Sequence, residues 1–237
     1  MKHLLFIAVL AMFTPPYHNI TEEIFINEDG SGRYNVYTNE VPMMKQAIMM
    51  RLQAEEQPKE NLEKKAEKEI WSTHPSNFNE ASNPLNKANK GEVSDPKKRS
   101  LLRNITNFTI GNKLKNTIDS GVMCKFNNLE ELSQLMDILR TDPLQSLNSI
   151  QLKEPSVAFD ISNNNFTKQT LRANKKPITT TFQEGTFTTN LYLPNNVKKV
   201  KGNNVKNKKG RMVSFEYKLS DVLSGKIGTD FEVKWKK

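Results

Sequence analysis

The sequence predicts an α+β protein: a mainly antiparallel β-sheet, two helices packed on one face of it, and a long polar insert. Three observations support this fold class. Several segments alternate apolar and polar residues, two segments repeat apolar residues at helical spacing, and residues 54–100 are dominated by Glu, Lys, Asn, Ser and Pro. Alternation buries one face of a strand and leaves the other in water, as in an antiparallel sheet with one solvated face.

The N-terminus predicts export. Lys2 and His3 precede an unbroken apolar run, Leu4 to Phe13, which ends at Thr14 and two prolines. A basic start and a short apolar run are typical of a secretory signal, here residues 1–14. A membrane-spanning helix needs about 20 apolar residues, so this run is too short for a permanent anchor. The alternative is a buried N-terminal strand or helix in a cytoplasmic protein.

Residues 15–53 begin the main domain, and their first part predicts a β-hairpin. Ile24 and Ile26 alternate on one arm, and Tyr34 and Val36 alternate on the other. The segment 27–32 joins the arms and contains an Asp-Gly pair, which supplies the positive φ angles of tight hairpin turns.

A helix is expected directly after this hairpin. Pro42 suits its first turn, and Val41, Met44, Ile48 and Leu52 recur at helical spacing. The helix is rich in methionine, a soft metal ligand, but no His or Cys lies close in sequence, so we interpret the methionines as packing residues.

Residues 54–100 are interpreted as a mobile polar insert, because their composition buries little apolar surface. Within it, residues 59–71 predict a charged helix with Leu62, Ala66 and Ile70 on one stripe. Pro75 and Pro84 then stand among polar residues.

Residues 101–237 form the remainder of the main α+β domain. Alternation predicts strands over 105–110, 122–126, 157–161, 178–182, 187–193, 213–219 and 231–235. Asn128, with Glu131 three residues later, predicts the capped start of a helix that ends at Asp142-Pro143. Cys124 is the only cysteine, and its place on the apolar face of a strand predicts a buried, inert thiol.

The net charge of +9 is concentrated near the C-terminus, where residues 195–237 hold twelve Lys and Arg against four Asp and Glu. The candidate binding residues are the basic side chains of one short stretch: Lys198, Lys199, Lys201, Lys206, Lys208, Lys209 and Arg211. One interpretation is a solvated hairpin loop. The other is electrostatic contact with anionic headgroups, where each basic residue contributes about 1 kcal/mol. The stretch holds no aromatic residue on which bases could stack, and with export this argues against a nucleic acid partner.

No catalytic or metal-binding motif is evident. The three histidines are His3, His18 and His74, which lie in the signal or in segments expected to be irregular. We therefore expect no metal, no cofactor and no enzyme. A pair of carboxylates that meets only in the folded protein, as in a hydrolase, stays open as an alternative.

Both ends of the chain resemble a family. The segment Ile20 to Tyr34, which leads to Pro42-Met43-Met44, resembles the opening of bacterial envelope lipoproteins of the LppM-like domain family. The segment Leu191 to Val200 and the strand beginning at Met212 resemble that family's strand, Leu-Pro bend and following strand. The resemblance implies an α+β envelope domain, with lipid or glycolipid binding in some members and no catalytic residues. The lipid-bearing cysteine expected after the signal is absent from this sequence.

Together these observations predict a non-catalytic exported or cell-envelope protein that acts as a binding or structural module. Its expected partners are an anionic lipid, a glycolipid or an envelope protein, with peripheral membrane association. The alternatives are an exported carboxylate-dependent hydrolase and an assembly partner in an envelope complex.

Overall fold

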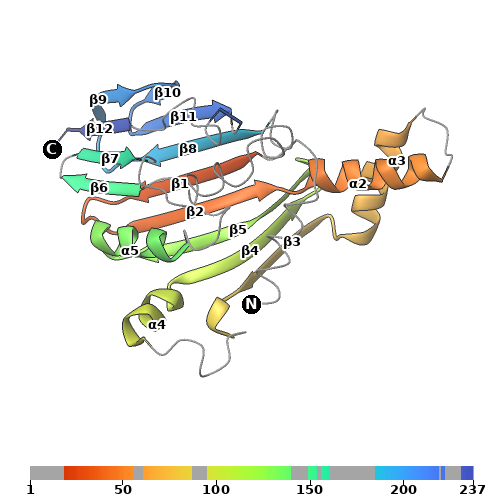
Figure 1. Ribbon diagram of the computed structural model, residues 1–237, viewed down its shortest axis with the longest axis horizontal. Coiled ribbons are helices and arrows are strands. Elements are labelled where there is room, and N and C mark those ends of the chain that lie inside the picture. Colours follow the sequence, from red (N-terminus) through yellow and green to blue (C-terminus); the bar gives the residue numbers. More distant parts are fainter. Residues whose placement is uncertain are drawn as a thin grey trace.

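The computed structural model describes residues 19–55, 61–86, 95–139, 149–153, 156–160, 185–218, 220–221 and 231–236. Within these residues the chain forms two β-sheets and four α-helices, which confirms the predicted α+β class (Figure 1). None of the described helices is long and apolar enough to cross a membrane. The predicted signal, the strand over 178–182 and the end of the helix that starts after Asn128 lie outside the described residues.

The larger sheet has eight strands in the order β10-β11-β8-β1-β2-β5-β4-β3. All neighbours pair antiparallel except β1 and β8, which are parallel. Its strands are β1 Ile20–Ile26, β2 Gly32–Asn39, β3 Asn77–Ser82, β4 Ile105–Asn112, β5 Thr117–Phe126, β8 Thr186–Tyr192, β10 Val205–Lys209 and β11 Met212–Lys218. The centre of the fold therefore joins strands from both ends of the chain.

The predicted hairpin is confirmed as β1 and β2, with Ile24 opposite Tyr34 and Ile26 opposite Gly32. Gly30 has a φ of +80°, which a residue with a side chain adopts only under strain. The side chain of Asp29 fixes the same turn, because its Oδ1 accepts hydrogen bonds from Ser31 N at 2.9 Å and Ser31 Oγ at 2.6 Å.

A second sheet, which the alternation pattern did not reveal, has the order β6-β7-β12-β9. Its strands are β6 Ser149–Lys153, β7 Ser156–Asp160, β9 Val197–Gly202 and β12 Phe231–Trp235. It packs on the apolar face of the larger sheet, where the Phe215 and Phe231 rings stack with centroids 3.9 Å apart. An alternating strand shows which residues are buried but not which sheet it joins.

The helix α5, Leu129–Leu139, completes this core with Leu132, Leu135 and Met136, all fully buried. Its predicted cap is confirmed: Asn128 Oδ1 accepts a hydrogen bond from Glu131 N at 2.9 Å. Glu131 Oε2 accepts in return from Asn127 N at 2.7 Å. These two bonds satisfy amide groups that a helix start leaves without partners.

The prediction that two helices share one face of the sheet is wrong for the first of them. α2, Val41–Ala54, extends beyond the end of the sheet and packs on α3, Leu62–Thr73 (Figure 1). Val41, Ile70, Trp71 and Ile118 form a small separate cluster there. α2 follows β2 after a single residue, so it continues past the sheet end and does not fold back over it.

The predicted polar insert also needs correction, because part of it belongs to the fold. α3 buries Leu62, Ala66 and Ile70, which confirms the predicted stripe. β3 pairs with β4 as an edge of the larger sheet. The short 3₁₀ helix Pro84–Asn86 and α4, Pro96–Arg103, follow. Low average hydrophobicity concealed β3 and α4, whereas α3 was visible because one narrow apolar stripe is enough for a helix to pack.

Candidate functional site

Six of the seven predicted basic residues lie on two edge strands and Arg211 lies in the β10–β11 turn, so they do not form one hairpin loop. Lys198, Lys199 and Lys201 belong to β9, the edge of the smaller sheet, while Lys206, Lys208 and Lys209 belong to β10, the edge of the larger sheet. The chain crosses between the sheets at Gly202 and Asn204, both of which have positive φ. β9 and β10 contact each other (Figure 1). We call these six lysines and Arg211 the basic edge.

Two of the seven residues are held by ion pairs. Glu232 Oε2 lies 2.8 Å from Lys201 Nζ, and its Oε1 lies 3.0 Å from Lys234 Nζ. Hydrogen bonds from Lys201 and Lys234 lower the pKa of Glu232 to about 2. Lys206 pairs with Glu216.

The other five side chains are exposed and have no ion-pair partner among the described residues: Lys198, Lys199, Lys208, Lys209 and Arg211. Within the described part of the chain, the basic edge therefore presents five positive charges without an ion-pair partner, four of them on paired strands and one in the β10–β11 turn. Such an arrangement attracts anionic surfaces.

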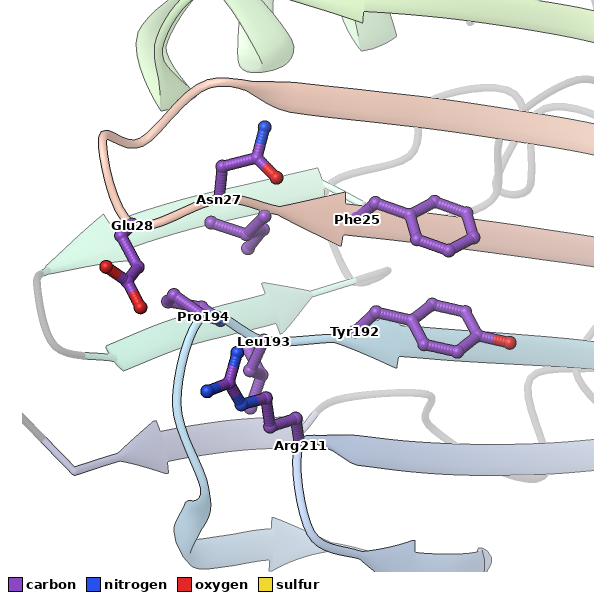
Figure 2. A pocket seen from close by; sticks show the side chains of 8 residues that line it. Phe25, Asn27, Glu28, Tyr192, Leu193, Pro194 and Arg211 are labelled. Atoms are coloured by element: carbon purple, nitrogen blue, oxygen red, sulfur yellow. The ribbon is translucent and has the colours of Figure 1, made fainter.

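Arg211 also lines a shallow pocket of about 250 Å³ (Figure 2). It stands between β10 and β11, and its carbonyl oxygen accepts a hydrogen bond from Leu193 N at 2.8 Å. Figure 2 shows Glu28 and Arg211 on opposite sides of Pro194. Glu28 is the one carboxylate in the lining. The pocket thus offers one cation and one anion, and it does not hold the facing carboxylate pair that the hydrolase alternative requires.

Two aromatic rings form the pocket wall and begin a stacked row on the outer face of the larger sheet. The Phe25 and Tyr192 rings stack with centroids 4.3 Å apart, and the Arg33 guanidinium carbon lies 4.5 Å from the Phe25 centroid. Both faces of the Phe25 ring are therefore covered by neighbouring side chains. The row rigidifies the outer face, and the Phe25 ring has no free face on which a ligand could stack.

Polar residues fill the same outer face next to this row. Asn35 Nδ2 donates a hydrogen bond to Glu23 Oε2 at 3.1 Å. Burial, together with the carboxylates of Glu23 and Asp119, raises the pKa of Tyr37 to about 12. Burial and Glu23 also raise the pKa of Asp119. Gly121 leaves the space for Tyr37, because a Cβ there would lie 2.6 Å from the Tyr37 Cβ.

A buried acid on the opposite, inner face was not foreseen from the sequence. Glu22 is fully buried, and it accepts hydrogen bonds from Tyr34 Oη at 2.9 Å and Thr189 Oγ1 at 3.0 Å. Glu22 stands at a position of β1 that the alternation turns toward the core. The pattern could therefore indicate that its side chain is buried, but not which groups bind it. These hydroxyls come from β2 and β8, the two neighbours of β1.

The other reactive side chains are placed in structural roles. Burial raises the pKa of the Cys124 thiol to about 12, which fits the predicted inert thiol. His74 ends α3, with its Nδ1 2.8 Å from the Ile70 carbonyl oxygen. No cluster of three or more His, Cys, Asp or Glu suited to a metal ion occurs among the described residues.

No protein-family model matches the sequence, and no curated protein matches it. Among solved structures, the chain is similar to the folded domain of LppM from Mycobacterium tuberculosis, determined by NMR. The two are 10% identical, the match covers 94% of this chain and 92% of that chain, and the TM-score is 0.46. An identity of 10% and a TM-score below 0.5 transfer no ligand, activity or anchor to this chain.

Proposed function

We propose that this protein is a non-catalytic binding protein of the cell envelope whose basic edge holds an anionic surface such as lipid or glycolipid headgroups. One observation carries the proposal. Strands from two different sheets bring four exposed lysines to one edge, and the β10–β11 turn adds Arg211; none of the five has an ion-pair partner in the described part of the chain. Because each contributes about 1 kcal/mol near an anionic surface, five together are sufficient for stable but salt-sensitive association.

A structural role could explain the same lysines. Edge strands expose unpaired backbone groups, and charged side chains prevent them from pairing with other molecules. Protection of this kind works with either sign of charge, whereas binding to anions requires positive charge. Glutamate at the same positions therefore separates the two explanations.

The test is co-sedimentation of the purified chain with vesicles, either neutral phosphatidylcholine or vesicles that also contain phosphatidylglycerol. The test variant replaces Lys198, Lys199, Lys208 and Lys209 by Gln. We expect its partition coefficient on anionic vesicles to fall roughly 1,000-fold at low salt, because four charges are removed. The same four positions changed to Glu should abolish anionic binding and leave the protein soluble.

A matched variant controls for net charge. It replaces four exposed basic residues remote from the basic edge by Gln: Lys64, Lys68, Arg103 and Lys125. This control should retain most of the preference for anionic vesicles. Because any lipid binding through the apolar run near the N-terminus would not depend on lipid charge, the deciding quantity is the ratio of anionic to neutral binding. An equal loss of that ratio in both variants would reject the basic edge as the binding surface.

A further inference from the structure

Exposed apolar side chains gather at the end of the molecule away from the basic edge. Four large hydrophobic side chains are exposed among the described residues: Leu114 at 95%, Met50 at 59%, Ile110 at 42% and Val205 at 41%. Val205 lies on β10. The other three lie on α2, on β4 and in the β4–β5 turn.

Strand pairing places Ile110 and Leu114 at one end of the larger sheet, and α2, which carries Met50, extends beyond the same end. Ile20 at the start of β1 pairs with Thr38 near the end of β2, and Thr38 pairs with Ser120 near the start of β5. The β4–β5 turn lies beside α3, where Trp71 Nε1 donates a hydrogen bond to Asn116 Oδ1 at 2.9 Å. We call α2, α3 and the turn Lys113–Asn116 the apolar end (Figure 1).

The turn holds Leu114 away from the protein surface in a fixed conformation. Lys115 N donates to Asn112 Oδ1 at 3.0 Å, and Asn116 N donates to the Lys113 carbonyl oxygen at 3.1 Å. Lys113 and Lys115 flank the leucine, and neither has an ion-pair partner among the described residues. An apolar tip between two amines matches the boundary between headgroups and acyl chains.

α2 adds apolar surface to the same end. Its Val41, Met44 and Ile48 face the small cluster with α3, whereas Ala47 and Met50 are exposed, and the exposed polar residues Arg51 and Gln53 follow in its last turn. The middle of the helix therefore adds one exposed apolar side chain, that of Met50, to the apolar end. Methionine side chains are flexible, so they adapt to a fluid partner more readily than to a rigid one.

The sequence places a bilayer within reach of this end. The apolar run Leu4 to Phe13 is separated from Ile20 by six residues, which span at most about 20 Å when extended. β1 begins at the apolar end. While this run is held in a membrane as the predicted signal, α2 and the β4–β5 turn are therefore close to the bilayer surface.

We propose that the apolar end docks on a lipid bilayer, with Leu114 entering the acyl region and Lys113 and Lys115 contacting lipid phosphates. The basic edge then points away from this bilayer, free to hold a second anionic surface. This proposal is independent of the basic edge, because it uses different residues.

The two tryptophans provide the test, since Trp71 lies at the apolar end and Trp235 pairs with Val197 of β9 near the basic edge. The variant W235F retains only Trp71, and the variant W71F retains only Trp235. Each is mixed with neutral vesicles whose acyl chains carry bromine, which quenches the fluorescence of a nearby tryptophan. We expect Trp71 fluorescence to be quenched at least twice as strongly as that of Trp235. Leu114→Glu should weaken partitioning about tenfold, which is the transfer of one leucine side chain.

Val205→Glu is the matched control, because it changes the exposed hydrophobic residue of β10, the edge strand remote from the apolar end, and it should leave quenching unchanged. If either Trp→Phe chain fails to fold, hydrogen exchange on the parent chain replaces it, with vesicles expected to protect residues 43–54 and 112–117. Equal or stronger quenching of Trp235, or an unchanged Leu114→Glu variant, overturns the proposal. If the amides of residues 112–117 become protected from exchange as protein concentration rises in the absence of lipid, the apolar end binds a second copy of the chain and the proposal is overturned.

Discussion

The sheet body and the apolar end differ in how they are stabilised. The body has one continuous core that combines residues of both sheets and α5, and it includes fully buried aromatic side chains. At the apolar end, the described cluster has four buried residues: Val41, Ile70, Trp71 and Ile118. Opening free energies vary across a protein with the apolar contacts that each region makes, so the apolar end should open more readily than the body.

The two regions also differ in their exposed chemistry. The body ends in a basic edge whose charges stand on paired strands, whereas the apolar end exposes Leu114 and Met50. The comparison indicates a rigid body that presents charge and a less stable end that presents apolar surface. Four substitutions test this difference between the two regions.

The largest effect is expected between the two sheets. Phe215→Ala removes a fully buried ring that stacks on Phe231. The lost burial and the cavity should lower the free energy of unfolding by about 4 kcal/mol. Urea denaturation, followed by circular dichroism, measures this change. A loss below about 1 kcal/mol would mean that the smaller sheet does not rely on this contact.

The second effect concerns the buried acid. Glu22→Ala leaves the Tyr34 and Thr189 hydroxyls without their acceptor in the core and should cost about 3 kcal/mol. Glu23→Ala, one residue later on the partly solvated face, is the matched control and should cost less than about 1 kcal/mol. Equal losses in the two variants would contradict the assignment of the inner face as the core.

The third effect is local. Ile70→Ala removes a buried side chain from the small cluster and should cost about 2 kcal/mol. The cost should appear as faster amide exchange in α2 and α3, while exchange in β1, β2 and β5 stays as in the parent chain. Faster exchange throughout the sheet would show that the apolar end and the body unfold as one unit.

The smallest effect concerns the charge of the basic edge. Glu232→Gln removes the carboxylate that neutralises Lys201 and Lys234. One more uncompensated charge should strengthen binding to anionic vesicles about fivefold at low salt. Co-sedimentation measures the change, and Glu80→Gln on the remote strand β3 is the control. Weaker binding of Glu232→Gln would contradict the proposed role of the basic edge.

The strands and helices of the described regions could largely be predicted because their signals are local. Alternation in β1, β2, β8, β11 and β12, and the Asn128 cap of α5, depend on neighbouring residues only. The basic cluster was visible for the same reason, since its seven residues lie within fourteen positions. The pocket wall was not visible, because Phe25 and Tyr192 lie far apart in sequence and meet through the parallel pairing of β1 with β8.

The sequence by itself determined which residues turn inward, where turns and caps form, and that positive charge concentrates near the C-terminus, because these depend on short-range spacing. Only long-range contacts decided that β9 and β10 belong to different sheets, that two hydroxyls bind Glu22, and that α2 lies at the end of the sheet, where the β4–β5 turn contacts α3. The physical reason is that strand partners and docking positions are set by contacts between distant segments, which no local pattern encodes.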